Sequence, residues 1–307
     1  MSSEILDNSS DNEAGEKSSG EYERILTEID SVLARPDEQR PEAISVFIGN
    51  RVNELTASSR PRNISIAEFY QGFIHPESNI RRSFIVDPFR IDDPDIYLEL
   101  VQNIGELKNM PGWDQKTTRE LMPTAVLYTI AKYFGNAVGT SDTENRNRQF
   151  YMDSTTSESQ GISVKELKGK GIAVCAEKAA VCQNLLSFVG LDSTLVFSDK
   201  CQLAEEKENL HAYNIIHTER GYFIFDPTNP EQYTKQNTRE LVNYSPVFYP
   251  ITVEQYQNLK SGGTVEISHT DYVVTDGGTK QPEVSKRIYG GPNQEIFQGK
   301  EGQNSLK

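Results

Sequence analysis

The hydrophobic residues of the N-terminal half of the chain recur at helical spacing. Between residues 21 and 33 they stand three or four positions apart, which predicts an amphipathic helix. The same periodicity indicates further helices at about 41–55, 94–110 and 115–134. Pro123 lies inside the last of these and should kink or divide it. We therefore expect a helical region over residues 21–150.

Three polar segments interrupt or flank this pattern. Residues 1–20 are rich in Ser, Glu, Asp, Gly and Asn, which is typical of a disordered tail. Residues 135–160 are rich in Ser, Thr, Asn and Asp, so a loop is expected there, near the mouth of any active site. Residues 291–307 are also polar and are predicted to be a flexible tail.

The segment 169–190, GKGIAVCAEKAAVCQNLLSFVG, reads as a flexible lead followed by one short helix. Gly190 should end that helix, because a glycine just past the last periodic residue commonly does so. The helix would begin at Cys175. Its apolar positions recur at steps of four and three, which places them on one stripe: Cys175, Ala179, Cys182, Leu186 and Val189.

Alternating or β-branched runs follow this helix and predict strands. They lie at 193–197, 210–216 and 221–227, and the last two should form a β-hairpin with a tight or four-residue connection. If Ile216 pairs with Gly221, His211 lies directly opposite Asp226, with Cβ atoms ~4.5–5.5 Å apart. A slip of one residue would place the two side chains on opposite faces.

Further strand-like runs in the C-terminal third, one pair joined by a Gly-Gly turn, complete an α+β pattern. We predict a core over residues 151–290 in which the Cys175 helix packs on an antiparallel β-sheet. The helical region 21–150 precedes it.

Composition narrows the possible functions. The formal net charge of −14 argues against nucleic-acid or anionic-membrane partners, since both need a basic surface. Three cysteines in a long chain do not form a disulfide framework, and neither a signal peptide nor a membrane-spanning segment is evident. A cytoplasmic location is therefore expected. No motif indicates a cofactor or metal site, and the sequence does not indicate an oligomeric state.

Cys175, His211 and Asp226 are the candidate functional residues. A cysteine in the first turn of a helix lies near unpaired N–H groups and the positive end of the helix dipole, which favours its thiolate. Each residue alone has a structural explanation: a buried hydrophobe, a strand histidine, a turn aspartate before proline. Together they supply a nucleophile, a base and a carboxylate to orient the base.

The pattern VCAEKA at a helix start, HAYNII and then GYFIFDPTNP resembles the core of the transglutaminase-like superfamily, a branch of the papain-like cysteine hydrolase fold. The similarity covers about residues 169–230. It implies that Cys175 is the nucleophile, His211 the general base and acid, and Asp226 the orienting carboxylate. The upstream side chain that completes the oxyanion hole is open between Trp113, Gln160 and the asparagines of the 135–160 loop.

The function expected from this resemblance is acyl transfer to, or hydrolysis of, an amide bond through a Cys-His-Asp triad. The enzyme would act on a protein or peptide, as a protease, a deamidase or a transglutaminase. The alternative is a catalytically inactive relative that uses the same cleft to bind a protein or peptide.

Overall fold

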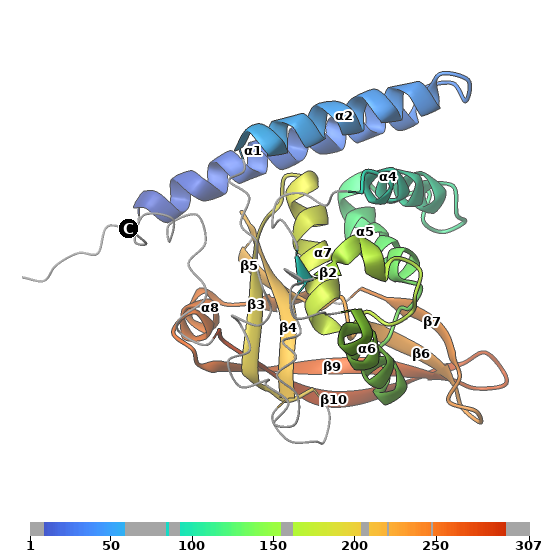
Figure 1. The fold of residues 1–307 in the computed structure, drawn as a ribbon, viewed down its shortest axis with the longest axis vertical. Coiled ribbons are helices and arrows are strands. Elements are labelled where there is room, and N and C mark those ends of the chain that lie inside the picture. Colours follow the sequence, from blue (N-terminus) through green and yellow to red (C-terminus); the bar gives the residue numbers. More distant parts are fainter. Residues whose placement is uncertain are drawn as a thin grey trace, which may run out of the picture.

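The computed structural model describes residues 9–58, 84–85, 93–154, 162–203, 209–219, 221–246 and 248–292. These residues form a mixed α+β fold in which a helical layer covers two β-sheets (Figure 1). The helices are α1 (Ser9–Leu33), α2 (Arg40–Ser58), α4 (Asp95–Lys108), α5 (Thr118–Phe134), α6 (Ser141–Ser154), the 3₁₀ helix η1 (Val164–Leu167), α7 (Cys175–Phe188) and α8 (Val253–Lys260). Among the described residues, no helix combines the length and the apolar character needed to cross a lipid bilayer.

The strands form two four-stranded sheets and one short pair. The central sheet has the order β3-β4-β5-β8 and is antiparallel throughout. The second sheet has the order β10-β9-β6-β7 and contains one parallel pair, β6 with β9. The bounds are β1 (Phe84–Ile85), β2 (Ile162–Ser163), β3 (Asp192–Cys201), β4 (Asn209–Thr218), β5 (Gly221–Phe225), β6 (Glu231–Lys235), β7 (Leu241–Ser245), β8 (Phe248–Ile251), β9 (Thr264–Val274) and β10 (Lys280–Gly290).

The central sheet lies between α7 and the second sheet, whose strands β9 and β10 run across β3 and β4 (Figure 1). Side chains alternate between the two faces of a strand. On β4, Ala212 and Ile216 therefore pack in the core on the α7 side, and Tyr213 and Ile215 pack in a second core with Tyr289 of β10. A sheet buried on both faces explains why its strands read as near-continuous apolar runs.

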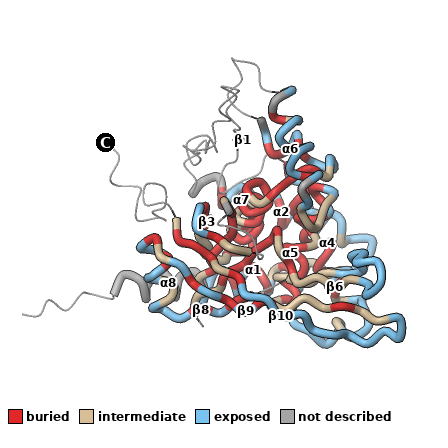
Figure 2. The backbone as a smooth tube through the Cα atoms, turned by 90° about the horizontal axis from the view of Figure 1, so that it is seen from below, coloured by how far each residue is buried: buried red, intermediate tan, exposed pale blue. Residues whose placement is uncertain are grey.

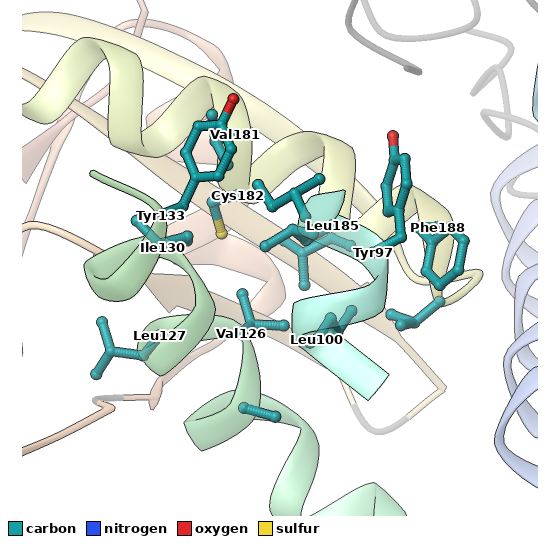
Figure 3. Packing of buried hydrophobic residues seen from close by; sticks show 14 of the residues in the cluster. Tyr97, Leu100, Val126, Leu127, Ile130, Tyr133, Val181, Cys182, Leu185 and Phe188 are labelled. Carbon is teal, nitrogen blue, oxygen red and sulfur yellow. The ribbon is translucent and has the colours of Figure 1, made fainter. Parts of the chain in front are cut away.

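One hydrophobic core joins the helical region to the predicted catalytic core. It extends from α1 to β5, and residues of α4, α5 and α7 interdigitate within it (Figure 3). Tyr97 of α4 stacks on Phe188 of α7 with ring centroids 4.4 Å apart. The buried backbone is concentrated around α5 and α7, and the outer end of the β9–β10 hairpin is exposed (Figure 2). The predicted boundary at residue 150 falls inside α6, and residues on both sides of it belong to this core.

Three local predictions need correction. Helix α1 begins at Ser9, so residues 9–20 are helical where a disordered tail was expected, and residues 1–8 lie outside the described part. Extending an existing helix adds one hydrogen bond per residue without a new nucleation cost. Helix α6 occupies much of the predicted 135–160 loop. Pro123 does not divide α5, since at the sixth helical position it removes only one hydrogen bond near the helix start. Of the predicted tail 291–307, residues 293–307 are not described.

Arg51 of α2 fixes the C-terminal end of α7. Its side chain is buried, Nε donates to the Phe188 carbonyl at 2.7 Å, and Nη2 donates to the Ser187 carbonyl at 2.9 Å. A cation at this end also complements the helix dipole. Glu21 and Glu54 pair with the same guanidinium, so α1, α2 and α7 meet at one side chain.

Gly190 ends α7 as predicted, with φ at +81°. A side chain there would be doubly unfavourable, because a Cβ atom would also lie 2.8 Å from Cδ1 of Ile25. The glycine therefore allows α1 to pack closely against the end of α7.

Candidate active site

Cys175 is the first residue of α7, as the sequence predicts, and its side chain is partly exposed. The segment before Cys175 contains two glycines with positive φ, Gly169 and Gly171. Their N–H groups donate to the Tyr133 and Phe134 carbonyls at the end of α5, at 2.8 and 2.7 Å. These two hydrogen bonds fix the glycine-rich segment before Cys175, and with it the start of α7, against the end of α5.

A buried carboxylate caps the same helix start. Glu177 is fully buried, and its Oε2 accepts a hydrogen bond from the Val174 N–H at 3.1 Å. Its Oε1 accepts from Asn147 Nδ2 at 3.2 Å and from the Tyr151 hydroxyl at 3.0 Å, both from α6. Helix α6 thus holds the segment before Cys175 in place through polar contacts.

His211 and Asp226 form a buried pair on the central sheet. His211 Nε2 lies 2.8 Å from Asp226 Oδ2, and both side chains are almost fully buried. Cys175 lies close enough to His211 to act on its charge, since the Cys175 side chain contributes to the raised pKa of His211. Because Nε2 faces the Asp226 carboxylate, Nδ1 is the ring nitrogen that can exchange a proton with the Cys175 thiol. The structure therefore brings all three predicted residues together.

The hairpin that carries this pair has a different register from the predicted one. Thr218 pairs with Gly221, whereas the prediction paired Ile216 with Gly221. The connection between Thr218 and Gly221 is two residues long. Gly221 has φ at +120°, a value that favours glycine, and the Thr218 hydroxyl donates to the Gly221 carbonyl at 3.1 Å. The shift of two residues keeps His211 and Asp226 on one face, now as diagonal neighbours, so the contact survives the error.

Asp226 accepts five hydrogen bonds. The backbone N–H groups of Thr228 and Asn229 donate to Oδ1 at 2.9 and 3.1 Å, an arrangement typical of aspartate in a turn. Oδ2 accepts from His211, from Asn229 Nδ2 at 3.1 Å and from the Tyr289 hydroxyl at 3.0 Å. Every lone-pair direction of the carboxylate is thus engaged, which fixes both its charge and its orientation.

The electrostatics of the pair favour two opposite charges. Burial alone would raise the pKa of the Asp226 carboxyl, but the charge of His211, its hydrogen bond, Arg287 and Asn229 together hold that pKa well below its usual range. Burial likewise opposes the charged form of His211, yet the Asp226 carboxylate and then Cys175 raise the pKa of His211 well above its ordinary value. Both shifts favour the ion pair of the Asp226 carboxylate with the His211 imidazolium.

Lys178 adds a second cation near the thiol. It is fully buried on α7, three residues after Cys175, and its Nζ donates to the Ala137 carbonyl at 2.9 Å. Burial lowers the pKa of Lys178 to about 8, against the opposing influence of Asp226, Cys175 and Glu177. A cation within electrostatic reach of Cys175 stabilises a thiolate there.

The candidates for the second oxyanion donor separate into different positions. Gln160 lies outside the described residues. Trp113 packs against the hydrophobic core, with the Lys116 ammonium 4.1 Å from its ring. Asn147 uses its amide on the Ile172 carbonyl and Glu177. Asn136 donates to the Ala173 carbonyl at 3.0 Å, which places it beside the helix start that carries Cys175.

No protein-family model matches the chain, and no curated protein matches it either. The resemblance to the transglutaminase-like superfamily therefore stays a prediction, carried by three residues and their arrangement.

Sequence reasoning missed several residues that support the site. Asn229 had a usable signal, because an asparagine shortly after Asp-Pro in a turn commonly bonds that aspartate. Lys178 could have been placed on the Cys175 face by helical spacing. Tyr289 had no signal, since it is 63 residues from Asp226 and reaches it only through the packing of two sheets.

Replacing Tyr289 with phenylalanine is expected to lower the free energy of unfolding by ~1.5–3 kcal/mol, the usual loss for a hydrogen bond to a charged group. Without this donor the folded-state pKa of Asp226 rises, so the acid loss of stability should begin at higher pH. Urea unfolding between pH 3 and 7 measures both effects.

Tyr213→Phe is the matched control, because that hydroxyl donates to the neutral Gly290 carbonyl at 2.8 Å. This variant should lower the free energy of unfolding by ~0.5–1.5 kcal/mol and leave unchanged the pH at which acid begins to destabilise the protein. Equal acid limbs in the two variants would contradict a role for Tyr289 in holding Asp226.

Proposed function

We propose that this protein is a cysteine-dependent acyltransferase or amide hydrolase. The observation that carries the proposal is the continuous contact from Cys175 through His211 to Asp226, with the thiol partly exposed and the other two residues buried. The proposed substrate is a protein or peptide carbonyl. The finer assignment to the transglutaminase-like fold belongs to the same proposal.

In the first step the Cys175 sulfur attacks the carbonyl carbon of the amide, and His211 holds the proton that the thiol has given up. The carbonyl oxygen becomes an oxyanion. The backbone N–H of Cys175 at the start of α7 is unpaired within the helix and is the natural donor to that oxygen. Asn136, beside Ala173, is the proposed second donor.

The tetrahedral intermediate then collapses. The C–N bond breaks, His211 donates its proton to the departing amine, and an acyl thioester on Cys175 remains. An acceptor attacks this thioester while His211 takes the acceptor's proton, and the thiolate leaves. A water acceptor gives hydrolysis, and an amine acceptor gives transamidation. Asp226 keeps the imidazolium oriented throughout.

The buried pair also weighs against the alternative of an inactive binding module. Burying two ionised side chains has a substantial desolvation cost, and replacing such a pair with apolar residues is often neutral or stabilising. A surface that only bound peptides would not need a charged pair beneath it.

The test compares iodoacetamide labelling of Cys175, Cys182 and Cys201 from pH 5 to 9 by peptide mass spectrometry. Native Cys175 should react at least ~10-fold faster at pH 6 than Cys175 in the urea-unfolded chain, because cations beside a thiol favour the reactive thiolate. The comparison with the unfolded chain removes exposure as an explanation. His211→Gln keeps a hydrogen-bonding side chain and should abolish the excess. A native rate at or below the unfolded rate would end the proposal.

A further inference from the structure

Strand β7 is the free edge of the second sheet in the described part of the chain. Its only strand neighbour there is β6, and Leu241 and Val242 are 37% and 46% exposed. An edge strand offers a row of N–H and C=O groups to another extended chain. Such edges are commonly protected by charge, by proline or by a β-bulge. The sequence LVNYS has no charge and no proline, but its pairing with β6 is irregular at Val242, and the Tyr244 N–H donates to Asn243 Oδ1 at 2.8 Å.

A cavity of about 480 Å³ adjoins this strand, between β7 and the helices α4 and α5. The rings of Tyr128 and Tyr244 meet there edge to face, with centroids 5.3 Å apart. Other residues of its lining are Glu106, Lys132, Asn136 and Ala137. It therefore combines aromatic surface with polar and charged groups.

Two residues that line this cavity also form hydrogen bonds with the start of α7 or the segment just before it. Asn136 donates to the Ala173 carbonyl at 3.0 Å, and Ala137 accepts from Lys178 Nζ at 2.9 Å. The same loop thus lines the cavity on one side and contacts the first turn of α7 on the other.

Strand β7 leads to the triad at its C-terminal end. Ser245 pairs with Glu231, the first residue of β6, and Ser245 Oγ lies 3.2 Å from Glu231 Oε2. Two residues earlier, Asn229 contacts Asp226 Oδ2 and lies 3.5 Å from His211 Nε2. An extended peptide bound along the edge of β7 would therefore run toward His211.

We propose that an extended segment of a polypeptide substrate pairs with the outer edge of β7 and passes the Tyr128–Tyr244 cavity to reach Cys175. The inference rests on the proposed function and names its substrate surface. The regular part of β7, residues 243–245, spans ~10 Å at 3.3–3.4 Å per residue, so the paired segment is about three residues long. Backbone pairing supplies the affinity, and the cavity selects a side chain.

The charges of the cavity select a basic side chain. Lys132 forms an ion pair with Glu99, so its charge is already compensated. Glu106 then leaves the cavity with a net negative charge. The formal net charge of −14 for the whole chain favours the same class of substrate.

The experiment uses the full chain with Cys175→Ala, so that binding is measured without catalysis. The probes are two pools of unstructured 12-residue synthetic peptides, identical except for lysine or glutamate at one central position. Hydrogen–deuterium exchange is read by mass spectrometry. Slower exchange at residues 241–245 with the lysine pool, and not with the glutamate pool, is the expected result.

Val242→Lys should weaken this protection by about tenfold, since an edge lysine opposes strand pairing and repels a basic peptide. Val284→Lys is the matched control, because Val284 is 68% exposed on β10, the other outer strand of the same sheet. It should leave the protection unchanged. Glu106→Gln should remove the preference for lysine while keeping the pairing.

Protection that is absent from 241–245, or equal effects of the two lysine variants, would overturn the β7 inference. Neither outcome depends on thiol reactivity, so each leaves the proposed function standing. Conversely, if β7 is protected but Cys175 is unreactive, the peptide-binding surface at β7 is supported and the proposed enzymatic function fails.

Discussion

Replacing Asp226 with asparagine is expected to lower the free energy of unfolding by about 3–5 kcal/mol near pH 6, the cost of breaking a buried ion pair from one side. The carboxylate accepts five hydrogen bonds. An asparagine offers one acceptor oxygen and directs an NH₂ group at remaining donors. His211 stays buried without its counter-ion.

The pH dependence of this loss follows from the two pKa shifts. The folded-state pKa of Asp226 is depressed, so its contribution is present above the unfolded value of about 3.9 and is lost as the pH falls through the folded value. The folded-state pKa of His211 is raised, so its contribution is complete below about 6.5 and is lost as the pH rises through the folded value. The difference between wild type and Asp226→Asn should therefore be largest between about pH 4 and 6.5.

Chemical unfolding at pH 3, 5.5 and 9 measures this profile. Asp271→Asn is the control, because Asp271 Oδ1 lies 2.9 Å from Nε2 of the buried His269 but outside the candidate active site. It should leave the labelling rate of Cys175 unchanged, whereas Asp226→Asn should reduce it. A difference that is constant from pH 3 to 9 would contradict the charged pair.

Replacing Arg51 with methionine is expected to lower the free energy of unfolding by about 2–5 kcal/mol. The substitution leaves the Phe188 carbonyl without its buried donor, at ~1–3 kcal/mol for an unsatisfied group, and removes the charged donor from the Ser187 carbonyl, which still accepts from the Gly190 N–H. Methionine retains much of the apolar stem, so lost packing contributes little. The loss comes from the end of α7 opposite to Cys175.

Arg24→Met provides a matched comparison, because Arg24 pairs with Glu54, as Arg51 does, but at an exposed position. Exposed ion pairs contribute up to about 1 kcal/mol, so this variant should remain close to wild type in urea unfolding. If the two variants unfold at the same urea concentration, the link between α2 and α7 is not a major source of stability.

The Cys175 helix and the strands β3, β4, β5, β9 and β10 could be predicted because their signals are local. Strands β6, β7 and β8 and helix α8 were not predicted. The stripe that includes Cys175 and Cys182 and the stop at Gly190 placed α7 correctly. The pairing register depends on loop length, which sequence alternation does not determine, so it was wrong by two residues. The His211–Asp226 contact survived because only an odd shift changes the face.

Helix α6 was missed because its buried stripe is largely polar. Thr143, Asn147 and Tyr151 recur every four residues and face the interior, yet two of the three are polar. Hydrophobic periodicity cannot detect such a helix. Asn147 and Tyr151 can be buried because both donate hydrogen bonds to Glu177, which lies 30 and 26 residues away in the sequence.

The position of Tyr289 on β10 has a consequence for biosynthesis. A ribosome makes Cys175, His211 and Asp226 well before it makes the hydroxyl that completes the Asp226 acceptor set, 63 residues later. While residues 227–288 are being made, the nascent chain therefore lacks the Tyr289 hydroxyl that donates to Asp226. The acceptor set of Asp226 is complete only when β10 docks across β3 and β4.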